Sequence, residues 1–181
     1  MKIEYTLDRV DFLEYQLFAA SKSERIIKSR KKSRIRLPVV YFILGFLLFL
    51  FADLIFSLIF FGTGVAWYLL HPYFMKNRYI RHFEKYIDEN YQNRFGKLVT
   101  LDFEEEYIIA TDYLGESKLK IKEITEINEI KDYIFLKLSS GESLIIPKNK
   151  INSLKELSSL LTKISSDLSI NHNIDLNWKW N

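Results

Sequence analysis

Cysteine is absent from this 181-residue chain, and proline and glycine are sparse, with three and six residues respectively. The lack of cysteine excludes disulfide bonds, thiolate metal sites and a cysteine nucleophile. The few glycines form neither a P-loop nor a dinucleotide-binding pattern, and no serine lies in a nucleophile-elbow sequence. We therefore expect a protein that is not an enzyme and that holds no metal and no cofactor.

Charge is almost absent from residues 37–70, where Asp53 is the single charged side chain. One membrane crossing needs about 20 apolar residues, so this segment is too long for one helix and slightly short for two. It is either a hairpin of two short helices that turns at Ala52-Asp53, or one long tilted helix. The second interpretation places Asp53 inside the bilayer, at a cost of at least about 2.5–3.5 kcal/mol. A cleaved signal peptide is excluded, because the segment begins too late and lacks a small-residue cleavage site.

Positive charge flanks the apolar segment on both sides. The basic residues after it are Lys76, Arg78, Arg81 and Lys85, and those before it are Lys28, Arg30, Lys31, Lys32, Arg34 and Arg36. Because Lys and Arg favour the cytoplasmic side of a membrane, two basic flanks require an even number of crossings. The pattern favours a transmembrane hairpin with both termini cytoplasmic.

The basic run at residues 22–36 has three interpretations: it sets the topology with generic lipid contact, it forms a specific anionic-lipid site, or it binds nucleic acid. Because it adjoins the apolar segment, contact with lipid has the simpler geometry. We therefore expect the bilayer and anionic headgroups as partners, together with a protein partner or a homo-oligomer, and no nucleic acid. The predicted lipid contacts are the six basic residues before the apolar segment, and Asp53 marks the predicted turn.

The flanking segments have patterns of their own. Residues 1–7 alternate apolar and polar side chains as a strand does, and Asp8 then begins a helix predicted from about Arg9 to Arg34, with Ser21 and Ser23 as points of interruption. After the apolar segment, Pro72 marks a kink or a restart of the helix. A helical stripe follows at Tyr79, Ile80, Phe83, Tyr86, Ile87 and Tyr91.

From Lys97 the chain changes to short runs with strand periodicity, which predict an antiparallel meander with one buried face. The sequence Ser153-Leu154-Lys155-Glu156 is a capping box that begins an amphipathic helix, expected to plug the open end of a small curled sheet. The fold class is thus membrane α+β. The predicted divisions are residues 1–36, 37–70, 71–96, 97–168 and a tail at 169–181, where Trp178 and Trp180 either touch headgroups or the domain surface, or belong to a frayed end.

The stretch from Ser117 to Ile151 contains KEITEINEIKDYIFLKLSSGESLIIPKNKI and resembles the C-terminal domain of the YcxB-like membrane proteins. The N-terminal YTLDRVDFLEYQLF, the basic run and the apolar segment are similar to the same family. The more specific motifs are the strand at Tyr133–Leu138 and Ile146-Pro147-Lys148, whereas Leu119 replaces an aromatic residue found in many members. The resemblance implies a bacterial inner-membrane protein with a small antiparallel or partial-barrel domain of the pleckstrin-homology (PH) type, and it implies no site residues.

Other candidate residues carry no chemistry. His71 and His82 would lie about 16 Å apart along one helix and cannot share a metal ion. The adjacent acids Glu104, Glu105 and Glu106 are typical of a solvated turn.

The favoured hypothesis is a membrane-anchored cytoplasmic interaction or scaffold module that binds a protein or peptide, for example through an edge strand. The alternative is an oligomeric small transporter, or an accessory subunit of one, with Asp53 and the glycines lining a pore.

Overall fold

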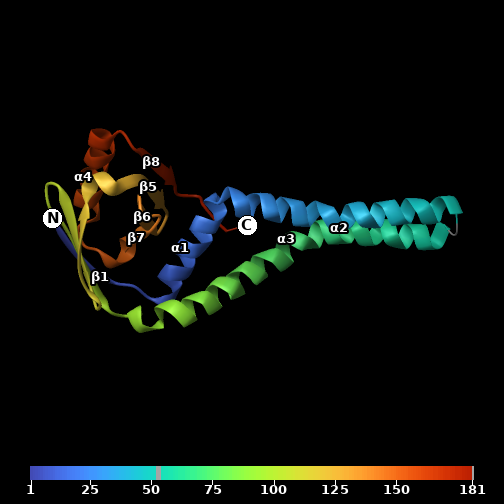
Figure 1. The fold of residues 1–181 in the computed structure, drawn as a ribbon, viewed down its shortest axis with the longest axis horizontal. Coiled ribbons are helices and arrows are strands. Elements are labelled where there is room, and N and C mark those ends of the chain that lie inside the picture. The colour runs from blue at the N-terminus through green and yellow to red at the C-terminus, as the bar shows by residue number, and fades with distance from the viewer. Residues whose placement is uncertain (52–53, 181) are drawn as a thin grey trace. The chain divides into compact units, whose positions relative to one another are not determined.

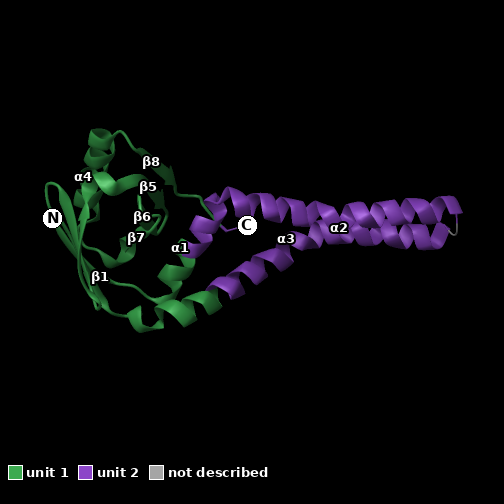
Figure 2. Ribbon diagram, in the orientation of Figure 1, with its two compact units in different colours: residues 1–15, 84–179 green, residues 16–83, 180–181 purple. Residues whose placement is uncertain are grey.

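The computed structural model describes residues 1–51 and 54–180, so the predicted turn at Asp53 lies outside the described residues. The chain is α+β and divides into two compact units (Figures 1 and 2). Unit 1 contains residues 1–15 and 84–179, and unit 2 contains residues 16–83 and 180–181. The predicted divisions at residues 36, 70, 96 and 168 stay a prediction.

The helices are α1 (Arg9–Lys22), α2 (Glu24–Phe51), α3 (Leu54–Tyr91) and α4 (Leu154–Leu168). The strands are β1 (Lys2–Thr6), β2 (Leu98–Phe103), β3 (Tyr107–Asp112), β4 (Gly115–Lys120), β5 (Ile124–Ile130), β6 (Tyr133–Leu138), β7 (Ser143–Pro147) and β8 (Asn171–Asp175). Short 3-10 turns occupy Gln92–Arg94, Ile121–Glu123 and Lys148–Lys150.

The strands of unit 1 form two four-stranded sheets, in the orders β1-β2-β3-β4 and β7-β6-β5-β8. The prediction of one small sheet is therefore wrong, although each run of consecutive strands is an antiparallel meander as expected. The division occurs at the 3-10 turn Ile121–Glu123, after which β5 pairs with β6 and not with β4. The second sheet is mixed, because β8 runs parallel to β5 whereas the other neighbouring strands are antiparallel.

Strand β1 is confirmed, but its partner is far away in the sequence. It pairs with β2 in antiparallel register, from Lys2 opposite Asp102 to Thr6 opposite Leu98. Just beyond this pair, the N–H of Gly96 donates to the carbonyl of Leu7 at 2.9 Å. Gly96 has a φ of +67°, a conformation that favours glycine. The chain thus leaves the sheet and returns to it at one place, and α1 to α3 are an insertion between two neighbouring strands.

The core of unit 1 includes both faces of β6, where Ile134, Phe135 and Leu136 are all buried. Helix α4 buries Leu157, Leu161 and Ile164, as its amphipathic pattern predicts. Its first residue follows Ser153, but the Ser153 side chain makes no capping hydrogen bond, so the predicted capping box is wrong. The φ and ψ of Ser153, −108° and 41°, depart from the extended backbone typical of a side-chain cap.

Helices α2 and α3 lie side by side within unit 2 and run antiparallel (Figure 1). Phe42 packs against Phe61 with ring centroids 5.6 Å apart, and Tyr41 packs against Phe60 at 6.1 Å. Both helices are long and apolar enough to cross a membrane. The predicted helix is interrupted at Ser23, so residues 24–36 of the basic run belong to α2 and continue into the apolar segment without a break. Helix α3 continues through Pro72 and does not restart there.

The described part of the C-terminal segment, residues 169–180, contains a strand. Asn171–Asp175 forms β8, and Trp180 is only 6% exposed. The frayed-end alternative is therefore wrong for Trp180, whereas contact of Trp178 or Trp180 with headgroups stays a prediction. The composition of this segment gave no strand signal, because β8 is polar and exposed and depends on pairing with β5 for its conformation.

Candidate functional site

The candidate site is the basic end of the α2–α3 pair, where the predicted lipid-contact residues lie. Next to it, the apolar side chains of both helices are exposed over much of their length, with Phe51 at 81% and Leu69 at 61%. The helices therefore present an apolar surface that is bounded at one end by Lys and Arg side chains. Of the six predicted residues, two are engaged within unit 2 and four are exposed.

Arg34 is engaged with α3 through Tyr68. Its guanidinium lies 4.1 Å from the centre of the Tyr68 ring, and its Nε donates to the Tyr68 carbonyl at 3.2 Å. The carbonyl lacks its usual helical donor, because the residue four positions later is Pro72, which has no N–H. Arg34 thus supplies the hydrogen bond that proline removes, which explains how α3 tolerates proline at this point.

His71 lies one helical turn further along the same interface. It is 4% exposed, and its Nε2 is 3.0 Å from the Ser33 hydroxyl on α2. Its ring also packs on Trp67, with centroids 5.7 Å apart. His71 is therefore a polar contact between the two helices. The interface changes here from packed aromatic rings to hydrogen bonds and cation–π contacts.

Arg30 is enclosed by two aromatic rings from distant parts of the chain. Its guanidinium lies 4.6 Å from the centre of the Trp180 ring and 5.8 Å from that of Tyr79. Trp180 and Tyr79 also meet edge to face at 5.7 Å. Arginine stacks well on aromatic faces, so this cluster fixes Trp180 on the helical pair. Sequence analysis did not identify the cluster, because no local pattern connects residues 30, 79 and 180.

The other four predicted residues are exposed. Lys28 pairs with Glu24 at 2.7 Å along the helix surface, and both side chains are largely solvent-accessible. The exposed cations without a contact described here are Lys31, Lys32 and Arg36. Exposed long side chains of this kind can reach phosphate groups without the loss of an internal partner. Contact with anionic lipid stays a prediction for all six residues.

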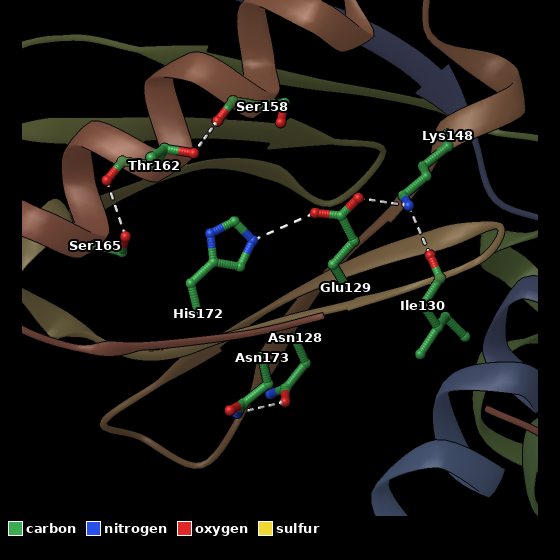
Figure 3. A network of polar contacts seen from close by, with 9 residues as sticks. All are labelled: Asn128, Glu129, Ile130, Lys148, Ser158, Thr162, Ser165, His172 and Asn173. Atoms are coloured by element: carbon green, nitrogen blue, oxygen red, sulfur yellow. Dashed lines mark hydrogen bonds and ion pairs between the residues drawn. The ribbon is translucent and has the colours of Figure 1, made fainter. Parts of the chain in front are cut away.

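A second polar cluster lies in unit 1 and is centred on Glu129 of β5 (Figure 3). Its carboxylate is 2.7 Å from Lys148 Nζ and 3.3 Å from His172 Nε2. Lys148 also donates to the carbonyl of Ile130 at 2.6 Å. All three charged or titratable side chains are at most 17% exposed. The cluster joins β8 to β5, since His172 belongs to β8.

The hydroxyl groups near His172 do not form a catalytic arrangement. Thr162 and Ser165 lie on α4 to one side of the ring (Figure 3), but each donates to a carbonyl of its own helix, at 2.9 Å. Beside the cluster, Asn173 Nδ2 donates to Asn128 Oδ1 at 3.1 Å. The Asn173–Asn128 contact joins β8 to β5, and among the described residues the Thr162 and Ser165 hydroxyls bond within α4 and not to His172. Among residues 1–51 and 54–180, no group of three His, Asp or Glu side chains could hold a metal ion.

A third cluster surrounds the buried carboxylate of Asp11 near the start of α1. Asp11 accepts hydrogen bonds from the Tyr133 hydroxyl at 2.9 Å, from Lys150 Nζ at 2.7 Å and from the Asp8 N–H at 2.6 Å. Burial and the bond to Asp11 raise the pKa of Tyr133. Burial acts to lower the pKa of Lys150, but the bonds to Asp11 and Asp8 outweigh it and raise that pKa. The cluster connects α1, β6 and the turn after β7.

A groove of about 790 Å³ lies between the β2–β3 turn, the end of β4 and α4. Its rim carries charges of both signs, with Lys120, Lys122 and Lys163 on one hand and Glu104, Glu105, Glu106 and Asp167 on the other. The three adjacent acids are exposed in the β2–β3 turn, as their sequence suggests. This mixture of charges selects no class of ligand.

Comparison with known proteins identifies part of the chain. Residues 103–164, from the end of β2 into α4, match a family model described as YcxB-like protein. Searches of the curated proteins and of the solved structures found no match. The match includes the stretch from Ser117 to Ile151 on which the predicted resemblance depends, so that prediction is confirmed there. Residues 103–164 of this protein are therefore similar to the YcxB-like proteins.

Proposed function

We propose that this protein is a membrane-anchored, non-catalytic interaction module. In this proposal α2 and α3 cross the inner membrane of a bacterium as a hairpin, and unit 1 is a PH-like domain in the cytoplasm. The observation that carries the proposal is the apolar surface of the α2–α3 pair, bounded at one end by cations. Soluble monomers rarely expose apolar patches larger than a few hundred Å², so this surface favours contact with lipid.

The cations support both the orientation and the partner. Lys31, Lys32 and Arg36 are exposed on α2, and Arg78 and Arg81 are exposed on α3. Since the two helices are antiparallel, their basic ends lie together. The preference of Lys and Arg for the cytoplasmic side then predicts that both ends of the hairpin face the cytoplasm, next to anionic headgroups.

The PH-like assignment is supported by the order of the strands. Strands β1 to β4 form one antiparallel meander, β5 to β7 form a second, and α4 follows them. The family resemblance implies a small curled arrangement of strands with one helix, and two meanders followed by α4 are compatible with it. In our proposal the domain is discontinuous, with β1 supplied from before the hairpin and the other strands from after it. The polar clusters described above support a non-catalytic role, because their groups bond to one another and to the backbone.

The absence of native cysteine allows a direct test of the anchor. Single cysteines are introduced at Ala52→Cys, beside the predicted turn, and at Ser140→Cys, in the exposed turn between β6 and β7. A thiol reagent that cannot cross lipid is then added to intact cells and, separately, to lysed cells. We expect labelling at position 52 in intact cells, and labelling at position 140 only after lysis.

Labelling at position 140 in intact cells, with position 52 protected, would reverse the proposed orientation. Recovery of the chain in the soluble fraction would remove the anchor altogether. The transporter alternative stays a prediction. It required the glycines to line a pore, but Gly45 and Gly64 pack against aromatic side chains of the neighbouring helix.

A further inference from the structure

Strand β4 is the outermost strand of its sheet, since it pairs with β3 on one side and with no described residue on the other. Five of its six residues are exposed. A free edge of this kind presents unpaired N–H and C=O groups that can accept another strand. It also lacks proline, which would block such pairing.

The ladder with β3 determines which groups face the open edge. The Ile121 N–H donates to the Glu106 carbonyl at 2.9 Å, which makes those two residues a hydrogen-bonded pair. Hydrogen-bonded pairs alternate along an antiparallel ladder, so Leu119 and Ser117 also bond inward to β3. The backbone groups of Glu116, Lys118 and Lys120 therefore point outward.

The charged side chains along this edge match those of a second β4 strand that runs in the opposite direction. When two β4 strands run antiparallel about a two-fold axis at Ser117, Glu116 lies opposite Lys118 of the second copy, and the pairing occurs twice. Opposite charges in such cross-strand positions are stabilising, whereas like charges are not. An axis at Lys118 would set two lysines against each other, and an axis at Glu116 would set two acids against each other. An axis between residues would mismatch the outward-facing groups.

Glu116 and Lys118 also lie on the same face of the sheet. Strand alternation places them together, and Lys118 Nζ lies 4.1 Å from the centre of the Tyr107 ring on that face. In the single chain Lys118 Nζ is turned toward Tyr107 of β3, so pairing of two β4 edges would move it from that ring to Glu116 of the second copy.

We propose that two copies of this protein associate through antiparallel pairing of their β4 edges, with Ser117 opposite Ser117 of the second copy. The inference deepens the proposed function, on which it rests, by naming a second copy of the chain as the partner of the interaction module. Anchoring in one membrane raises the local concentration of the two copies, so a short strand pair suffices to join them. The interface is self-complementary and closed, as expected for a two-fold dimer.

The register can be tested with one residue in this cysteine-free chain. In the proposed register Ser117 occupies a non-hydrogen-bonded position, where facing Cα atoms lie about 4.5 Å apart, within the range that a disulfide spans. Full-length Ser117→Cys in native membranes is expected to form a disulfide-linked dimer under mild oxidation. The matched control, Ser140→Cys, is also exposed but lies in the β6–β7 turn of the other sheet, and it should cross-link at least tenfold more slowly.

Charge reversal provides the second arm. With Ser117→Cys present, either Glu116→Lys or Lys118→Glu should reduce cross-linking several-fold, and the two together should restore it. The inference is overturned if Ser117→Cys cross-links no faster than the control, if it links mainly to a different protein, or if charge reversal has no effect. Thermal unfolding of each variant checks that the domain is intact. The labelling of position 52 reports on the anchor separately, so failure of the dimer and failure of the anchor are distinguishable.

Discussion

At the residue scale, the buried carboxylate of Asp11 shows how single groups stabilise unit 1. Lys150 is 24% exposed at the side chain and Asp11 is 5% exposed, so their contact is largely shielded from water. Removing one partner of such a pair leaves an uncompensated charge. We expect Lys150→Met to lower the free energy of unfolding by about 3 kcal/mol. Lys155→Met, at an exposed position on α4, should change it by less than about 0.5 kcal/mol. Denaturant unfolding in detergent measures both.

Glu14 gives a pH-dependent prediction in which removal of a partly buried charge stabilises unit 1. Burial raises the pKa of Glu14, and the nearby charge of Asp132 raises it further. A raised pKa means that the folded state binds the proton more tightly, so the contribution to stability is present below the ordinary pKa and is lost as pH rises through the raised one. Glu14→Gln should therefore increase the melting temperature at pH 7 and have little effect near pH 4. Equal shifts at both pH values would contradict this account.

At the element scale, the packing of α2 on α3 depends on one close approach. A Cβ on Gly45 would lie 3.1 Å from the Phe61 ring, whereas a Cβ on Gly62 would meet nothing within 4 Å. Gly45→Leu should therefore force the helices apart, while Gly62→Leu should be tolerated. The distance between spin labels on the two helices, compared with the parent chain, measures this difference. Comparable changes in both variants would show that Gly45 has no special role.

The bond between Arg34 and the Tyr68 carbonyl gives a second prediction for these helices. Arg34→Ala should destabilise the pair, because it leaves the carbonyl without a donor. Pro72→Ala should restore a helical N–H to that carbonyl. We therefore expect Arg34→Ala to cost about 1 kcal/mol less when Pro72→Ala is also present. A double-mutant cycle by thermal unfolding in detergent tests this coupling, and simple additivity would exclude the proposed bond.

At the scale of the whole molecule, the sheet of unit 1 needs a strand that precedes the long helices. Ile3 and Tyr5 of β1 are buried, at 3% and 5% exposure. A chain that begins at Lys97 contains the predicted domain but lacks these residues, so we expect it to remain unfolded. Adding residues 1–15 through a flexible linker to residues 84–179 should restore folding, because these two segments together form unit 1. Circular dichroism of the two chains tests the prediction, and a cooperative melt from the shorter chain would contradict it.

The polar strand β8 and the aromatic cluster at Arg30 were beyond sequence analysis. Polar and apolar side chains do not alternate along β8, and the strand forms because it pairs in parallel with β5. The six basic residues could be chosen from sequence, but their division into engaged and exposed groups could not. That division depends on Tyr68, Tyr79 and Trp180, which approach only after the helices pack.

The sequence by itself determined the features that depend on near neighbours: two long apolar stretches with basic flanks, strands with alternating side chains, and one amphipathic helix near the end. These follow from local hydropathy and periodicity. Only the tertiary structure decided that β1 joins β2 across the helices, that the strands form two sheets, and that Trp180 encloses Arg30. Those contacts join residues far apart in the chain, and their geometry depends on which surfaces remain to be buried once the local elements have formed.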